Sequence, residues 1–114
     1  MAVLCEGKMD SYTIGDLGGC LHGKVMSDAQ FVKLVSNKDK IGTIAIMLDG
    51  DAMKDALRIA ERLYQHFDDI RICRIEDRTS DPNSLGREKV LDCITHAEPY
   101  DSFFPIKAKL KGWA

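Results

Sequence analysis

Acidic residues in two short stretches of this 114-residue chain have the types and the spacing for metal-dependent phosphate chemistry. Asp49 and Asp51 are separated by one glycine and follow an apolar run, and Glu6 follows another such run. Carboxylate oxygens are ligands that Mg²⁺ and Mn²⁺ prefer. Because like charges repel, carboxylates that converge are expected to share a cation or a proton. A divalent cation held there can orient a phosphodiester or triphosphate and stabilise the charge that develops on it.

Two apolar segments are predicted to be the strands that position these acids. Residues Ile44–Leu48 form an uninterrupted apolar run, which is typical of a strand buried on both faces of a parallel sheet. Residues Ala2–Cys5 form a shorter run that ends at Glu6. Parallel strands place their carboxyl ends at one edge of the sheet, so Glu6 and the Asp49/Asp51 pair are expected to meet there.

Helical patterns alternate with the predicted strands. Ser27 and Gln30 have the spacing of a capping box, and residues 52–67 carry apolar side chains every three or four positions. Asp81 followed by Pro82 indicates the start of another helix. Further strands are expected near residues 20–22 and 70–75. This order predicts an α/β fold, a three-layer sandwich with a mostly parallel four-stranded central sheet of the Rossmann-like type.

The composition is that of a soluble globular protein, with 45% apolar and 30% charged residues. The net charge of −2 gives no general attraction to nucleic acid, so such binding would depend on local basic patches or on metal ions. The longest apolar run, Ile44–Leu48, is too short to span a membrane, and no signal peptide is visible. We therefore expect a cytoplasmic protein whose four scattered cysteines are reduced.

The acidic motifs resemble those of the Toprim domain, which topoisomerases and primases share. The resemblance is best to the primase branch, meaning bacterial DNA primases and phage primase-helicases, and it covers residues 2–97. It rests on three motifs in chain order: Glu6-Gly7-Lys8-Met9-Asp10, Asp49-Gly50-Asp51 and Asp81-Pro82-Asn83. The chain departs from the pattern at Met53-Lys54, where many members have Ala-Gly.

The resemblance implies a Toprim-like fold and a Mg²⁺ (or Mn²⁺) cofactor held by catalytic acids at Glu6, Asp49 and Asp51. Asp10 and Asp81 match further acidic positions of the primase branch and are expected to be additional metal ligands. The implied reaction is nucleotidyl transfer, which makes an RNA primer from nucleotides on single-stranded DNA. Full primases also have a zinc-binding part and a basic template-holding part, so a fragment or split subunit is expected. The remaining primase domains or a helicase would then be its partners.

Residues 1–98 are predicted to form the Toprim domain, and residues 99–114 a basic, aromatic C-terminal tail. Four lysines are candidate contacts for the nucleic-acid backbone: Lys8, Lys107, Lys109 and Lys111. Because residues 99–114 show no clear periodicity, a solvated tail is the simpler interpretation of the last three.

Other interpretations fit the same residues. A stand-alone Toprim nuclease would use the same acids to direct water at a phosphodiester. A receiver-like signalling domain would accept a phosphoryl group on Asp49, and a non-catalytic assembly module would not use it. Locally, Asp51 and Asp81 could be simple helix caps, and Asp10 a solvated acid on a helix.

Overall fold

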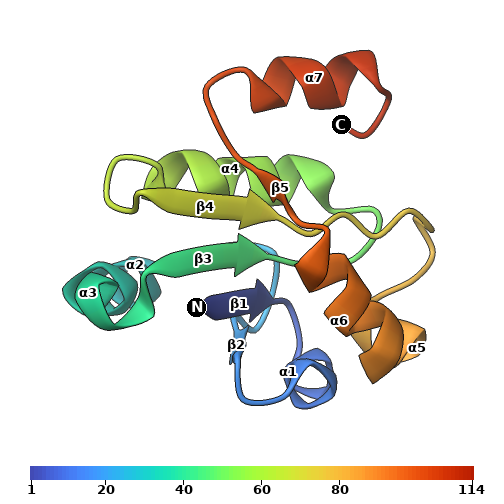
Figure 1. Ribbon diagram of the computed structural model, residues 1–114, viewed down its shortest axis with the longest axis horizontal. Coiled ribbons are helices and arrows are strands. Elements are labelled where there is room, and N and C mark those ends of the chain that lie inside the picture. Colours follow the sequence, from blue (N-terminus) through green and yellow to red (C-terminus); the bar gives the residue numbers. More distant parts are fainter.

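The computed structural model describes residues 1–114 and places a five-stranded sheet between two layers of helices (Figure 1). The strand order is β2-β1-β3-β4-β5; the first four strands are parallel and β5 runs antiparallel to β4. The strands are β1 (Ala2–Cys5), β2 (Gly18–Cys20), β3 (Thr43–Ile46), β4 (Asp69–Ile72) and β5 (Glu98–Pro99). The predicted α/β class and mostly parallel sheet are confirmed, with one strand more than expected.

Seven helices cover the two faces of the sheet. They are α1 (Lys8–Ile14), α2 (Asp28–Ser36), α3 (Lys38–Ile41), α4 (Met53–Leu63), α5 (Pro82–Leu85), α6 (Arg87–Thr95) and α7 (Phe104–Leu110). Figure 1 shows α1, α5 and α6 together on one side of the sheet, with α4 and α7 on the other. Two separate apolar clusters, one on each face, match this arrangement of three layers.

Strand β3 is the centre of the core because its side chains are buried on both faces. Ile44 and Ile46 pack with residues of α4 and α7, whereas Ala45 and Met47, the residue directly after β3, pack with residues of α1 and α6. All four are fully buried. Since β1 and β4 flank β3, the carboxyl ends of these three parallel strands lie side by side.

Two helix starts form as the sequence predicts. Ser27 Oγ accepts a hydrogen bond from Gln30 N at 3.1 Å, and Gln30 Oε1 accepts one from Ser27 N at 2.8 Å, so the capping box of α2 is complete. Asp81 Oδ1 accepts from Ser84 N at 2.7 Å, which caps α5 with Pro82 in its first turn. Both caps satisfy backbone donors that have no partner within the helix.

The C-terminal segment differs from the sequence prediction of an irregular, solvated tail. Within residues 99–114, α7 places Phe104 and Ala108 in the same apolar cluster as Ile46. These two residues are four positions apart and so share one helical face, but lysines on the other face obscure the period. The fifth strand also went unpredicted, because β5 has only two residues and one is proline, which only an edge strand tolerates.

Two further expectations from the sequence are that the four cysteines are reduced and that no apolar segment is long enough to span a membrane. All four cysteines are free thiols. Burial raises the pKa of Cys5 and that of Cys73 to about 12, so both stay protonated and act as small apolar groups. None of the helices combines the length and the hydrophobicity needed to cross a membrane.

Replacing Phe104 tests whether α7 belongs to the core. Phe104→Ala is expected to lower the free energy of unfolding by about 3–5 kcal/mol, because it leaves a cavity where the phenyl ring packs. The matched control is Phe103→Ala, since that neighbouring side chain is 73% exposed. The control is expected to change stability by less than about 0.5 kcal/mol. Urea denaturation followed by circular dichroism measures both, and equally small effects would contradict the packing of α7.

Candidate functional site

Glu6 and Asp49 meet at the carboxyl edge of the sheet. Strands β1 and β3 are adjacent and parallel, and Met47 N donates to Leu4 O at 2.8 Å just before the strands diverge. Beyond that point, Asp49 N donates a hydrogen bond to Glu6 Oε2 at 2.7 Å. This contact joins the first and third strands where the strand order switches direction, the usual position of ligand sites in open α/β sheets. The meeting of these two residues is therefore as the sequence analysis expects.

One oxygen of the Asp49 carboxyl group is buried without a hydrogen-bond donor. Its Oδ1 atom is buried and accepts no hydrogen bond, and it is the sole buried side-chain oxygen or nitrogen of the chain in that condition. Burial, then the adjacent Glu6 carboxylate, then the charges of Asp10 and Asp81 raise the pKa of Asp49 to about 7. A buried acceptor among negative charges is stabilised by a proton or by a cation. The donor set therefore fits a hard divalent cation.

Asp10 connects the two helices that surround this carboxyl group. Its Oδ2 accepts from Gly7 N at 3.2 Å, which caps α1, and its Oδ1 accepts from Asn83 N at 2.9 Å, at the start of α5. The residue is only 7% exposed. The interpretation of Asp10 as a solvated helix acid is therefore wrong, because both of its oxygens hold backbone groups in place.

Asp51 lies on the same turn as Asp49 but faces solvent. Its Oδ1 is 3.4 Å from Lys24 Nζ, and its side chain is 60% exposed. The N-terminus of α4 has no side-chain cap, so Asp51 does not act as the helix cap that one interpretation proposed. Sequence reasoning missed Lys24, because it lies in the irregular loop between β2 and α2, where no periodicity marks it.

Few of these acids stand close enough together to bind one ion jointly. No three of the His, Cys, Asp and Glu side chains are arranged to hold a single metal ion. Mg²⁺, however, usually binds through one or two carboxylates and keeps water molecules or substrate phosphates as its other ligands. Glu6 and Asp49 are two carboxylate residues that the hydrogen bond from Asp49 N to Glu6 Oε2 holds next to each other, while Asp81 uses one oxygen to cap α5.

The glycine between the two aspartates is required by packing. A Cβ atom at Gly50 would lie 2.0 Å from Asp77 O and 2.8 Å from Arg78 Cα. In addition, Gly50 N donates to Ser80 O at 2.9 Å. The loop that follows β4 therefore presses directly on the turn and fixes the direction in which Asp49 and Asp51 leave it.

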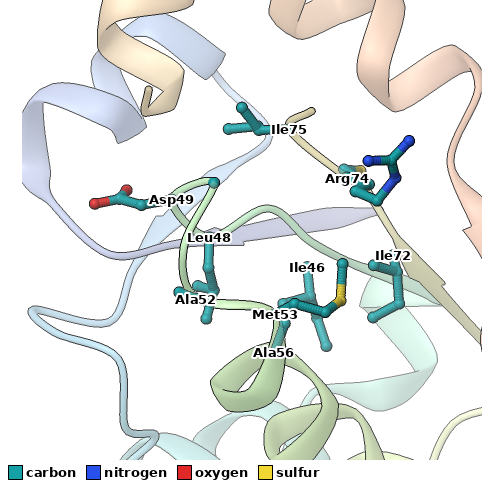
Figure 2. Close-up of a pocket in the computed structure, with 11 residues that line it drawn as sticks. Ile46, Leu48, Asp49, Ala52, Met53, Ala56, Ile72, Arg74 and Ile75 are labelled. Carbon is teal, nitrogen blue, oxygen red and sulfur yellow. The ribbon is translucent and has the colours of Figure 1, made fainter. Parts of the chain in front are cut away.

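An apolar hollow beneath this turn is separate from the carboxylate site. Met53, Ala56 and Ile72 are among its lining residues. Figure 2 shows the Asp49 carboxylate projecting away from these side chains, with Arg74 on the opposite side of the hollow. The hollow is a feature of core packing, and the site of interest lies on the other side of Asp49.

The candidate nucleic-acid-binding lysines fall in two places. Lys8 is exposed at the first position of α1, two residues after Glu6, and it forms no ion pair. Lys109 is exposed on α7. Lys107 pairs with Glu98, and the ammonium groups of Lys107 and Lys111 each lie 5.7 Å from the centre of the Trp113 ring. The lysines of residues 107–111 are thus carried by a packed helix and its end, not by a solvated tail.

Trp113 brings this basic group next to the carboxyl edge of the sheet. The Arg74 guanidinium stacks 4.3 Å from the centre of the Trp113 ring, and Arg78 donates a hydrogen bond to Gly112 O. Arg74 and Arg78 follow β4, and both line one small hollow with Gly50 and Trp113. The basic residues at the C-terminus therefore face the loop that supports the Asp49–Asp51 turn.

Comparison with known proteins shows a shared fold. Neither a protein-family model nor a curated protein sequence matches this chain. The chain superposes on the crystal structure of the Aquifex aeolicus primase, comprising zinc-binding and RNA polymerase domains, with a TM-score of 0.71 and 18% sequence identity. The match covers 98% of this chain and 30% of the primase chain. This chain therefore has the fold of a segment of a bacterial primase and spans less than a third of that protein's length.

The raised pKa of Asp49 predicts how the stability of the metal-free protein depends on pH. Its folded-state pKa of about 7 lies above the ordinary value of 3.8, so the folded state holds the proton more tightly than the unfolded state does. The destabilisation from ionising Asp49 is therefore absent below about pH 4, grows as the pH rises, and is complete above about pH 7. Asp49→Asn removes this effect and is expected to raise the urea midpoint at about pH 8 but not at about pH 4.

The control for this comparison is Asp16→Asn, which changes an exposed aspartate that precedes β2 and hence lies at the opposite end of the parallel strands from the site. Its difference from wild type is expected to be the same at both pH values. An Asp49→Asn midpoint below that of wild type at about pH 8, in the absence of divalent cations, would contradict the assignment of a raised pKa.

Proposed function

We propose that this chain is a primase-type Toprim catalytic domain, which uses Mg²⁺ for nucleotidyl transfer in making RNA primers on single-stranded DNA. The observation that carries the proposal is the contact of Glu6 with Asp49 beside a buried carboxylate oxygen that has no partner. The fold shared with a bacterial primase supports it. So does the resemblance of the three acidic motifs to those of Toprim domains.

Each acid has a role in this proposal. Glu6, Asp49 and Asp51 would hold Mg²⁺ (or Mn²⁺), and the Asp49 N–H keeps the Glu6 carboxylate in a fixed orientation. Asp10 and Asp81 add negative charge beside Asp49. Both accept backbone hydrogen bonds, and the lone pairs that these bonds leave free would provide ligands for a second ion. When bound, Mg²⁺ would neutralise these carboxylates and stabilise the charge on the phosphoryl group that is transferred.

The protonation state of Asp49 would couple to metal binding. A carboxyl group with a pKa of about 7 is partly protonated at neutral pH. A nearby cation favours the charged form, so Asp49 would release its proton as the metal enters. The affinity for Mg²⁺ should accordingly increase as the pH rises through neutrality.

The nucleic acid would be bound by basic residues outside the carboxylate site. Lys8 lies beside Glu6, while Lys107, Lys109 and Lys111 lie on or just after α7, and lysines bind phosphates as point charges. We propose single-stranded DNA and nucleotides as ligands and the cytoplasm as the location. Because the match covers 30% of the primase chain, the remaining primase domains or a helicase are the proposed partners.

Titration with Mg²⁺ and Mn²⁺ tests the metal site. Calorimetry of wild type, Glu6→Gln and Asp51→Asn is expected to show a loss of affinity of at least about tenfold in each variant, because each loses a charged oxygen ligand. Asp16→Asn is again the control and should bind as wild type does. If both site variants bind the metals as tightly as wild type, the assignment of Glu6 and Asp51 is wrong.

Product analysis tests the reaction. Incubation with a single-stranded DNA template, ribonucleotides and Mg²⁺ is expected to give short RNA products that Glu6→Gln abolishes, in the chain alone or with the remaining domains of a primase added. Shortened template without RNA products would indicate a nuclease instead. Labelling of Asp49 by a small phosphodonor, lost in Asp49→Asn, would indicate a receiver-like phosphoacceptor.

A further inference from the structure

The loop between β2 and α2 is attached directly to the strand end that carries Glu6. Leu21 N donates to Cys5 O at 2.8 Å, and Gly23 N donates to Glu6 O at 3.0 Å. His22 and Gly23 both have positive φ, 59° and 141°, so the chain bends sharply here. One end of the loop is therefore fixed relative to the candidate metal site.

The other end of the loop is fixed as well. The Met26 side chain is only 3% exposed, and Met26 O accepts a hydrogen bond from Arg62 Nη1 at 2.7 Å. Gln30 Nε2 donates to Leu21 O at 2.9 Å, which ties the loop to α2. Lys24 and Val25 lie between these attachments and are exposed to solvent. The position of Lys24 is thus set by its surroundings.

The charge around Lys24 is mainly that of the candidate metal ligands. Lys24 Nζ lies 3.4 Å from Asp51 Oδ1, and Asp51, then Glu6 and Asp55, raise the pKa of the lysine, so it stays protonated. Two further cations, Arg58 and Arg62, line the same hollow of about 110 Å³ as Lys24. Arg58 is paired with Asp55 and Arg62 with Asp28, whereas the partner of Lys24 is the aspartate proposed to bind the metal.

We propose that Lys24 occupies the place of a cation at Asp51 in the metal-free protein, and that it binds a phosphate group of the nucleotide once Mg²⁺ takes Asp51. This inference rests on the proposed function. The ion pair is solvent-exposed at both partners, so it contributes little to stability and exchanges readily. The displaced ammonium group remains beside the metal because its loop is anchored at both ends. A lysine there carries three donors and a full positive charge for a triphosphate.

The inference predicts opposite effects on two binding reactions, and the variant that tests it is Lys24→Gln. Without the competing ammonium group, Lys24→Gln should bind Mn²⁺ about 2- to 5-fold more tightly than wild type, as the usual strength of exposed ion pairs implies. With Mg²⁺ at saturation, it should bind inorganic tripolyphosphate more weakly. Lys24→Arg, which keeps the charge, should restore most of the tripolyphosphate affinity. A merely structural role for Lys24 would not strengthen metal binding.

The matched control is Lys40→Gln, which removes the same charge from an exposed residue of α3, before the start of β3 and hence at the opposite end of the strands. Calorimetry of both ligands, with Mn²⁺ also followed by electron paramagnetic resonance, provides the measurement. If wild type binds metal and Lys24→Gln matches Lys40→Gln for both ligands, the inference is overturned while the metal site stands. If wild type binds no metal, the proposed function fails and the inference fails with it.

Discussion

One hydrogen bond, from the Asp49 backbone to the Glu6 carboxylate, defines the arrangement on which the rest of the site depends. It joins two residues 43 positions apart in the sequence, and it forms because β1 and β3 are adjacent and parallel in the sheet. A parallel sheet requires the chain to return to the same starting edge for each strand, so the carboxyl ends of its strands gather residues from distant segments. The helices that follow these strands then bring Asp10 and Asp81 to the same place.

Gathering acids in this way works against folding stability unless their charge is balanced. At about 4 Å, two like charges repel by about 4 kcal/mol in a protein environment of intermediate polarity. The protein balances part of this charge locally: Asp10 and Asp81 accept backbone hydrogen bonds at helix starts, and Asp51 pairs with Lys24. Asp49 alone keeps a buried oxygen without a partner. Burial and the neighbouring acids raise the pKa of Asp49, so this one carboxyl group depends on a proton or a cation, and strongly shifted pKa values of this kind cluster at functional sites.

The sequence predicts the parts of this protein whose signals are local or follow from general rules of topology. The apolar run before Asp49 predicts a buried strand, and the capping residues Ser27 and Asp81 predict helix starts, because these patterns act within a few residues. The meeting of Glu6 with Asp49 follows from the common edge of parallel strands. In contrast, the partner of Asp51 is a lysine in an irregular loop, and α7 packs through two apolar residues that lie among lysines. Neither signal is visible before the tertiary contacts are known.

The tight contact of Gly50 with the segment after β4 has a consequence for how the sequence can vary. Because the backbone at Asp77 and Arg78 touches the glycine, the distance between the end of β4 and the cap of α5 must match the shape of the Asp49–Asp51 turn. Insertions or deletions between Glu76 and Ser80 would displace both aspartates, even though these residues are mostly exposed and belong to no regular element. The length of this loop is therefore under a constraint that surface loops seldom have.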